Sequence, residues 1–297
     1  MRLACFEKQS ATTCYQMKIT NSISKIRKIV VNWKRGGLSV ALVPTMGFFH
    51  EGHFALMREA GSKADRVIVS LFVNPAQFGP NEDLNRYPRD FDQDAKLAER
   101  EGVGCLFCPD SGDIYPSGFQ TWIRVEGLSQ GLCGASRPEH FRGVATIVAK
   151  LLIIVQPDKA IFGQKDFQQL QVIRRMVSDL NIPVNIIAHP IVREPDGLAM
   201  SSRNTYLDAK ERESAPSLFQ ALRLAEKMVA RGCGSGPEVV RAVRNHIQSF
   251  GNTKIDYIFL GDPETLKQRQ DIVGETLLAL AVWIGKTRLI DNTLLKQ

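Results

Sequence analysis

Two histidines and two glycines lie close together in one polar run, PTMGFFHEGH at residues 44–53. The run follows an apolar stretch, residues 38–43, that predicts a buried strand, and precedes residues 54–63, which predict a helix. Backbone N–H groups at the start of a helix are unpaired and the helix dipole is positive there, so this junction favours an anion. The run therefore predicts a phosphate-binding turn, with a triphosphate as the obvious ligand.

The glycines and histidines of this run have separate predicted tasks. Gly47 lets the chain turn sharply off the strand, and Gly52 lets a phosphate approach the backbone without meeting a Cβ. His50 and His53 share one face of the first helical turn, where imidazolium groups can donate hydrogen bonds to phosphoryl oxygens during adenylyl transfer. The alternatives are a capped helix start, a fortuitous pair, or a metal site, which would need further ligands. The flanking strand, helix and glycines favour phosphate binding.

Two further polar segments follow predicted strands. Asn74 and Gln77 come after the strand predicted at residues 66–73 and offer uncharged donors and acceptors for hydroxyl and carboxylate groups, although a loop cap would use the same residues. Residues 163–166 join another strand to a helix, as the first run does. We expect Lys165 to clamp phosphate and Gln169 to face the same cleft.

Two other segments are more ambiguous. Residues 193–204 hold hydroxyls and a guanidinium that can bind the β- and γ-phosphates when a second domain closes, but a plain linker would have the same composition. Their centre is Met200, Ser201, Ser202 and Arg203. Arg137 and His140 precede another helix and allow the same two interpretations.

Three aspartates at residues 90, 92 and 94 resemble a magnesium site at first sight. Their alternating spacing at a helix start points them apart, so we expect Asp90, Asp92 and Asp94 to complement the helix dipole instead. Magnesium then arrives with the nucleotide and is held by phosphate oxygens and water. No protein metal site is predicted.

The elements that position these segments alternate along the chain. Strands are predicted at residues 66–73, 104–108, 159–162 and 184–192, with helices at 91–101, 141–155 and 167–180. This order favours a Rossmann-like parallel sheet with helices on both faces, which binds ligands at the carboxyl ends of its strands. After residue 193 two helices and two β-rich runs, 255–260 and 276–284, predict a smaller α+β domain. We expect a disordered extension at 1–16, a Rossmann-like domain at 17–196 and a lid domain at 197–297.

Composition narrows the class of protein. The chain of 297 residues is 44% apolar and 23% charged, as in ordinary soluble proteins, and its apolar runs are too short to span a membrane. The net charge of +7 includes a cluster of cations among residues 18–35, where the apolar residues Ile23, Ile26, Val30 and Trp33 recur at helical spacing. The cations therefore favour the solvated face of an amphipathic helix over a nucleic-acid patch. Six scattered cysteines indicate reduced thiols in the cytoplasm, and we expect Cys105 and Cys108 to be packed rather than to bind zinc.

The polar segments, in this order, resemble the pantothenate synthetase family, whose members join pantoate to β-alanine. The resemblance extends from about Met17 to the C-terminus and rests on PTMGFFHEGH, FVNPAQFGPNEDLNRYPRD, RPEHFRGVATIVAKL, FGQKDFQQL and REPDGLAMSSRNTYL. The family often has Ala-Leu where Phe48-Phe49 stand and Glu in place of Gln164. Neither departure removes a functional group.

The resemblance implies a reaction in two steps, in which pantoate attacks ATP to form pantoyl adenylate and β-alanine then displaces AMP. It implies His53 as proton donor, with His50, Lys165 and Arg203 also catalytic. Gln77 would bind pantoate and β-alanine, and Gln169 pantoate. The implied ATP site comprises Met46, Gly47, Phe48, Phe49, His50, Glu51, Gly52, His53, Gly163, Gln164, Lys165, Asp166, Val192, Met200, Ser201, Ser202 and Arg203. The resemblance also implies a homodimer, ATP with Mg²⁺ on its phosphates, and no prosthetic group.

Two other functions remain open from the sequence. One is another adenylyl-transferring enzyme with the same His-x-Gly-His motif, and the FVNPAQF and FGQKDFQQL segments argue against it. The other is a non-catalytic nucleotide- or RNA-binding homologue, which would be expected to have lost a histidine or Lys165. Neither nucleic acid nor a membrane is the expected partner.

Overall fold

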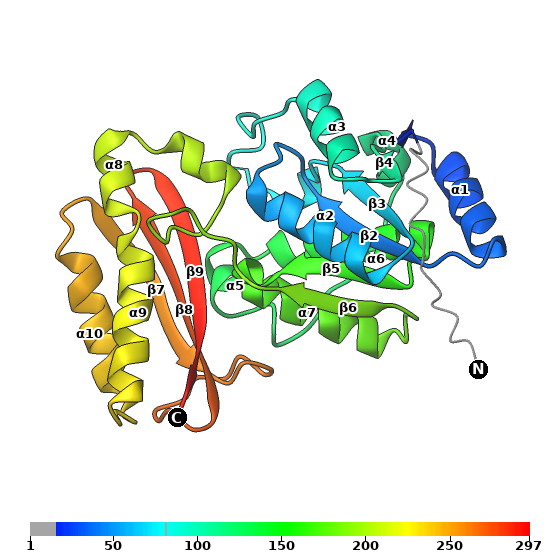
Figure 1. The fold of residues 1–297 in the computed structure, drawn as a ribbon. Helices are drawn as coiled ribbons and strands as arrows, with labels where there is room; N and C mark the ends of the chain where they lie inside the picture. Colours follow the sequence, from blue (N-terminus) through cyan, green and yellow to red (C-terminus); the bar gives the residue numbers. More distant parts are fainter. Residues whose placement is uncertain (1–15, 81) are drawn as a thin grey trace, which may run out of the picture.

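The computed structural model describes residues 16–80 and 82–297, so the extension predicted at 1–16 lies outside the described residues except for Gln16. A parallel sheet of six strands forms the larger part, in the order β1-β4-β3-β2-β5-β6 (Figure 1). The strands are β1 Lys18–Thr20, β2 Val40–Thr45, β3 Arg66–Leu71, β4 Cys105–Phe107, β5 Lys159–Gly163 and β6 Asn185–His189. The Rossmann-like sheet predicted from the sequence is confirmed.

Helices cover both faces of this sheet. They are α1 Ile23–Arg35, α2 Glu51–Lys63, α3 Phe91–Arg100, α4 Ser111–Ile114, α5 Cys133–Ser136, α6 His140–Val155 and α7 Phe167–Asp179. Side chains alternate along β2, so that Val40 and Leu42 share a core with α1, α6 and α7, while Ala41 and Val43 share the opposite core with α2 and α3. Both faces are buried, which explains the nearly continuous apolar runs of the strands.

The C-terminal part is an antiparallel sheet of three strands, β7 Thr253–Gly261, β8 Glu275–Ile284 and β9 Thr287–Lys296. Its helices are α8 Ala209–Ser214, α9 Ser217–Ala230 and α10 Gly236–Gln248, and α9 and α10 share its apolar core. The predicted division at residues 196 and 197 falls between β6 and α8, and the two parts lie side by side with β9 nearest the large sheet (Figure 1).

Two predicted strands are too long. The strand predicted at 184–192 ends at His189, and the next residue, Pro190, has no N–H to donate to the sheet. The strand predicted at 66–73 ends at Leu71, after which the short 3₁₀ helix η1, Pro75–Gln77, follows. Both early endings place apolar residues, 72–73 and 190–192, in the loops at the carboxyl edge of the sheet. Within the described residues no helix has the length and apolar character to cross a membrane.

Candidate active site

The phosphate-binding turn predicted at residues 44–53 has an unusual backbone conformation. Gly47 has φ +86° and Phe48 has φ +54°, so two successive residues lie in the left-handed region. Their conformation is fixed by Asp94 of α3, whose Oδ2 accepts from the Phe48 N–H and whose Oδ1 accepts from the Phe49 N–H, both at 2.7 Å. The Asp94 side chain is buried, and this burial raises the pKa of Asp94.

Asp92 and Asp94 lie in the first turn of α3, as the helix-dipole prediction expects, but Asp94 has a further task that the sequence did not predict. Asp90 does cap α3, since its Oδ1 accepts from the Gln93 N–H at 3.0 Å. Asp94, four residues further on, holds the turn after β2 through its two oxygens. Sequence spacing cannot reveal this contact, because it joins residues 45 positions apart.

The two histidines begin α2 and bind each other's backbone. His50 is the N-cap residue, and its Nδ1 accepts from the Gly52 N–H at 3.1 Å. His53 Nδ1 accepts from the His50 N–H at 3.3 Å, and the ring centroids are 4.1 Å apart. Because each Nδ1 accepts a hydrogen bond, each neutral ring carries its proton on Nε2. The expected sharing of one face is confirmed.

The charge of these histidines differs from the prediction. Burial, followed by the charge of Lys165, lowers the pKa of His50 to about 4. Burial, then His50 and Lys165, lowers the pKa of His53 well below its ordinary value. At pH 7 the imidazoles are thus neutral rather than the expected imidazolium groups, because burial deprives a charged ring of part of its hydration and Lys165 already places a positive charge nearby. The Nε2–H groups remain available as hydrogen-bond donors.

A glycine at position 52 is also needed for packing, apart from the predicted approach of a phosphate. A Cβ at this position would lie 2.9 Å from Cε1 of the His50 ring, which is closer than real Cβ contacts. The missing side chain therefore makes room for the imidazole of His50 at the start of the helix.

One cleft of about 260 Å³ collects most of the predicted site at the carboxyl ends of β2, β3 and β5. The predicted residues that line it are Met46, His50, Gly52, His53, Gln77, Gly163, Lys165, Asp166, Gln169, Val192, Met200, Ser201, Ser202 and Arg203. Five predicted ATP-site residues do not line it, namely Gly47, Phe48, Phe49, Glu51 and Gln164. Phe49 is instead packed in the core, and the exposed Glu51 pairs with Arg58.

The cations of the cleft differ in their partners. Arg203 donates to Asp83 from Nε at 3.0 Å and from Nη2 at 2.9 Å. Lys165 is half-buried, and in the described part of the chain its ammonium has no hydrogen bond or ion pair. Burial is the largest cause that lowers the pKa of Lys165, while the carboxylates of Asp166 and Asp291 oppose this shift. Lys165 is thus the cation most available to an anionic ligand.

A network of fixed contacts orients Gln77. Its Nε2 donates to Met46 Sδ at 2.9 Å, and its Oε1 accepts from Asn74 Nδ2 at 3.2 Å. Its main-chain oxygen accepts from His140 Nδ1 at 2.9 Å and from Arg137 Nη2 at 3.2 Å. Arg137 and His140, which were ambiguous in the sequence, therefore support the wall of the cleft.

Other residues of the site were missed in the sequence. Glu82 pairs with Arg137, Asp83 pairs with Arg203, and Tyr87 contacts Ser202 with 3.5 Å between their hydroxyl oxygens. All three lie in the segment FVNPAQFGPNEDLNRYPRD, whose dense polar residues were the available signal. Their partners come from distant segments, which the sequence does not reveal.

Fold and site together define a Rossmann-like protein with a His-x-Gly-His turn at a cation-lined cleft of about 260 Å³. The family model for pantoate-beta-alanine ligase matches residues 18–294. Pantothenate synthetase of Moorella thermoacetica is 52% identical over 280 residues, which cover 94% of this chain and 99% of that protein. The pantothenate synthetase of Thermotoga neapolitana is 50% identical over 279 residues, which cover 94% of this chain and 100% of that protein.

Solved structures agree with these relatives. The crystal structure of pantothenate synthetase from Thermus thermophilus is 43% identical, with a TM-score of 0.88 over 93% of this chain and 99% of that one. Pantoate-beta-alanine ligase from Francisella tularensis, solved in complex with beta-gamma ATP and beta-alanine, is 36% identical with a TM-score of 0.78 and covers 94% and 98%. The chain belongs to the pantoate-beta-alanine ligase family, and its protein is an enzyme of that class.

Proposed function

We propose that the chain condenses pantoate with β-alanine at the cost of ATP, through a pantoyl-adenylate intermediate. The observation that carries the proposal is the arrangement of His50, His53 and Lys165 around one cleft with Gln77 and Gln169. The first three groups suit a phosphate chain, and the two amides suit the hydroxyl and carboxylate groups of a small acid.

In the first step the pantoate carboxylate attacks the α-phosphorus of ATP, and the bond to pyrophosphate breaks. No side chain acts as nucleophile, so the protein supplies orientation and charge stabilisation. The Nε2–H groups of His50 and His53, the Lys165 ammonium and the positive end of the α2 dipole favour the phosphates. The N–H groups of His50 and Gly52 are already bound to the two imidazoles, so they are not donors in this step. Bound phosphate raises the pKa of nearby imidazoles, and this shift lets His53 serve as the proton donor. Arg203, Ser201 and Ser202 hold the leaving pyrophosphate.

In the second step the amine of β-alanine attacks the acyl carbon of the adenylate, AMP leaves, and the amine loses a proton. Gln77 and Gln169 keep the pantoyl group in place through both steps. Phe72, Val144 and Ile147 line the same cleft and provide an apolar wall for the two methyl groups of pantoate. The hydrolysable anhydride needs protection from water, which the C-terminal domain provides as a lid.

Magnesium enters with ATP in this proposal. No cluster of three metal-binding side chains occurs among the described residues, and Asp166 is the carboxylate that lines the described part of the cleft. One carboxylate with phosphate oxygens and water suits Mg²⁺, which neutralises phosphate charge when bound. The proposal also includes a homodimer through the N-terminal domain and, because the four described cysteines are free thiols, the cytoplasm as its location.

The test is the substrate dependence of AMP formation by the purified protein. AMP should accumulate only when ATP, pantoate and β-alanine are all present, and replacement of pantoate by other hydroxy acids should abolish it. ATP consumption that is indifferent to pantoate would refute the proposal.

A further inference from the structure

One side chain of the C-terminal domain donates hydrogen bonds to the phosphate-binding segment around Lys165, residues 164–166. Asn292 of β9 donates from Nδ2 to the main-chain oxygens of Gln164 and Lys165, both at 3.0 Å. These two carbonyls belong to the 3₁₀ helix η2, Gln164–Asp166, which joins β5 to α7. Asn292 is 6% exposed, so its carboxamide is removed from competing water.

The short helix η2 has few contacts of its own that fix it. Gly163 at its start provides no side-chain cap, and Asp166 makes no capping hydrogen bond to the first turn of α7. A 3₁₀ helix of three residues is weakly stabilised by its own hydrogen bonds. Phe167, directly after η2, is buried against Leu277 and Ala279 of β8, and the two hydrogen bonds from Asn292 hold the backbone of Gln164 and Lys165 themselves.

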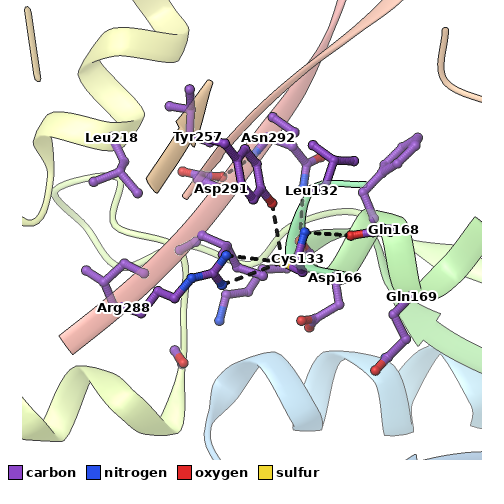
Figure 2. Close-up of a pocket in the computed structure, with 18 of the residues that line it drawn as sticks. Leu132, Cys133, Asp166, Gln168, Gln169, Leu218, Tyr257, Arg288, Asp291 and Asn292 are labelled. Atoms are coloured by element: carbon purple, nitrogen blue, oxygen red, sulfur yellow. Dashed lines mark hydrogen bonds between the residues drawn. The ribbon is translucent and has the colours of Figure 1, made fainter. Parts of the chain in front are cut away.

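Asn292 is itself held by a buried ion pair. Its N–H donates to Asp291 Oδ1 at 2.8 Å, and Asp291 accepts from Arg193 Nη1 at 2.6 Å and Nη2 at 2.9 Å. Arg193 also donates to Gly197 O at 2.9 Å in the segment that joins the two domains. Asp291 and Asn292 line one pocket of about 90 Å³ together with Asp166 and Gln168 of the large domain (Figure 2).

We propose that Asn292 is a positioning residue for Lys165, fixing the turn that aims its ammonium at the phosphates of ATP. This inference rests on the proposed role of Lys165. Asn292 acts on the nucleotide site through the backbone of Lys165 and makes no contact with ATP itself. Loss of Asn292 weakens binding of the phosphates and leaves pantoate binding unchanged, whereas a merely structural contact between the domains would affect both.

The test compares Asn292→Leu, which keeps the size of the side chain and removes both donors, with Thr293→Val. Thr293 lies next in β9 and donates from Oγ1 to Glu226 at 2.7 Å, inside the C-terminal domain. Calorimetric titration with ATP and with pantoate gives the dissociation constants. We expect Asn292→Leu to weaken ATP binding about tenfold, on the scale of two lost hydrogen bonds, and Thr293→Val to change it less than about twofold. Pantoate binding should be unchanged in both.

A double-mutant cycle separates positioning from structure. If Asn292 acts through Lys165, adding Asn292→Leu to Lys165→Met should weaken ATP binding by less than about twofold further. An equal loss in both backgrounds, or an equal loss of pantoate affinity, would overturn the inference while leaving the role of Lys165 intact. Unchanged ATP binding in Lys165→Met would overturn that role and the inference with it. Should Asn292→Leu not fold, Asn292→Ala, which removes the same donors and adds no charge, takes its place in the cycle.

Discussion

Replacing Asp94 by asparagine should release the turn that carries the two histidines. Asp94 is 2% exposed, and its two oxygens each accept one N–H at 2.7 Å. Asparagine keeps one acceptor oxygen, so one charge-assisted hydrogen bond, of about 1.5–3 kcal/mol, is lost. The NH₂ group of asparagine then faces a backbone N–H, and two donors cannot form a hydrogen bond. The expected decrease in the free energy of unfolding is about 2–4 kcal/mol.

The matched control is Asp92→Asn, which makes the same charge change in the first turn of α3 at an exposed position. The free energy of unfolding of Asp92→Asn should decrease by only about 0.3–1 kcal/mol, because only the interaction with the helix dipole is affected. Urea unfolding measures both variants, and the steady-state kcat/KM for ATP should fall at least about tenfold in Asp94→Asn alone. Equal losses of stability in the two variants would refute the proposed role of Asp94 and restore the helix-dipole interpretation.

Three further predictions concern the site directly. His53→Ala and Lys165→Ala should each lower kcat by about a hundredfold or more, as lost transition-state donors do, and near-normal turnover in both would contradict their roles. Burial lowers the pKa of His50 from 6.5 to about 4, so between pH 6.5 and pH 4 the unfolded chain binds more protons than the folded chain. The contribution of neutral His50 to the free energy of unfolding is therefore complete above pH 6.5 and is lost as the pH falls toward 4. Between pH 6.5 and pH 4, urea unfolding should show that the free energy of unfolding falls by up to about 3 kcal/mol more in the wild type than in His50→Gln. Identical pH profiles of the two proteins would be inconsistent with the lowered pKa of His50. Gly52→Ala should displace the His50 ring and weaken ATP binding in calorimetry, whereas Gly61→Ala in the same helix, where a Cβ meets nothing closer than 3.9 Å, should not.

The sheet could be predicted because its strands are local apolar runs separated by amphipathic helices. The last strand, β9, was missed because its sequence, TRLIDNTLLK, places charged and amide groups among apolar residues. In the structure Asp291 and Asn292 of this strand are buried and bind the large domain. Polar residues that bind the other domain thus interrupt the alternation of apolar and polar residues from which a strand is predicted.

The site could be predicted where one local segment supplies both the backbone geometry and the side chain. His50, His53 and Lys165 follow strand ends, and all three line the cleft. The tasks of Asp94 and Asn292 could not be predicted, because each depends on a hydrogen bond to a distant backbone group. The neutral state of the histidines likewise depends on burial and on the approach of Lys165, which arise only in the folded chain.

The most direct test of the central claim is the exchange of labelled pyrophosphate into ATP in the absence of β-alanine. A cleft that forms pantoyl adenylate should catalyse this exchange only when pantoate is present, and the exchange should be lost in His53→Ala. Exchange without pantoate, or no exchange by a protein that still forms pantothenate, would contradict the adenylate mechanism.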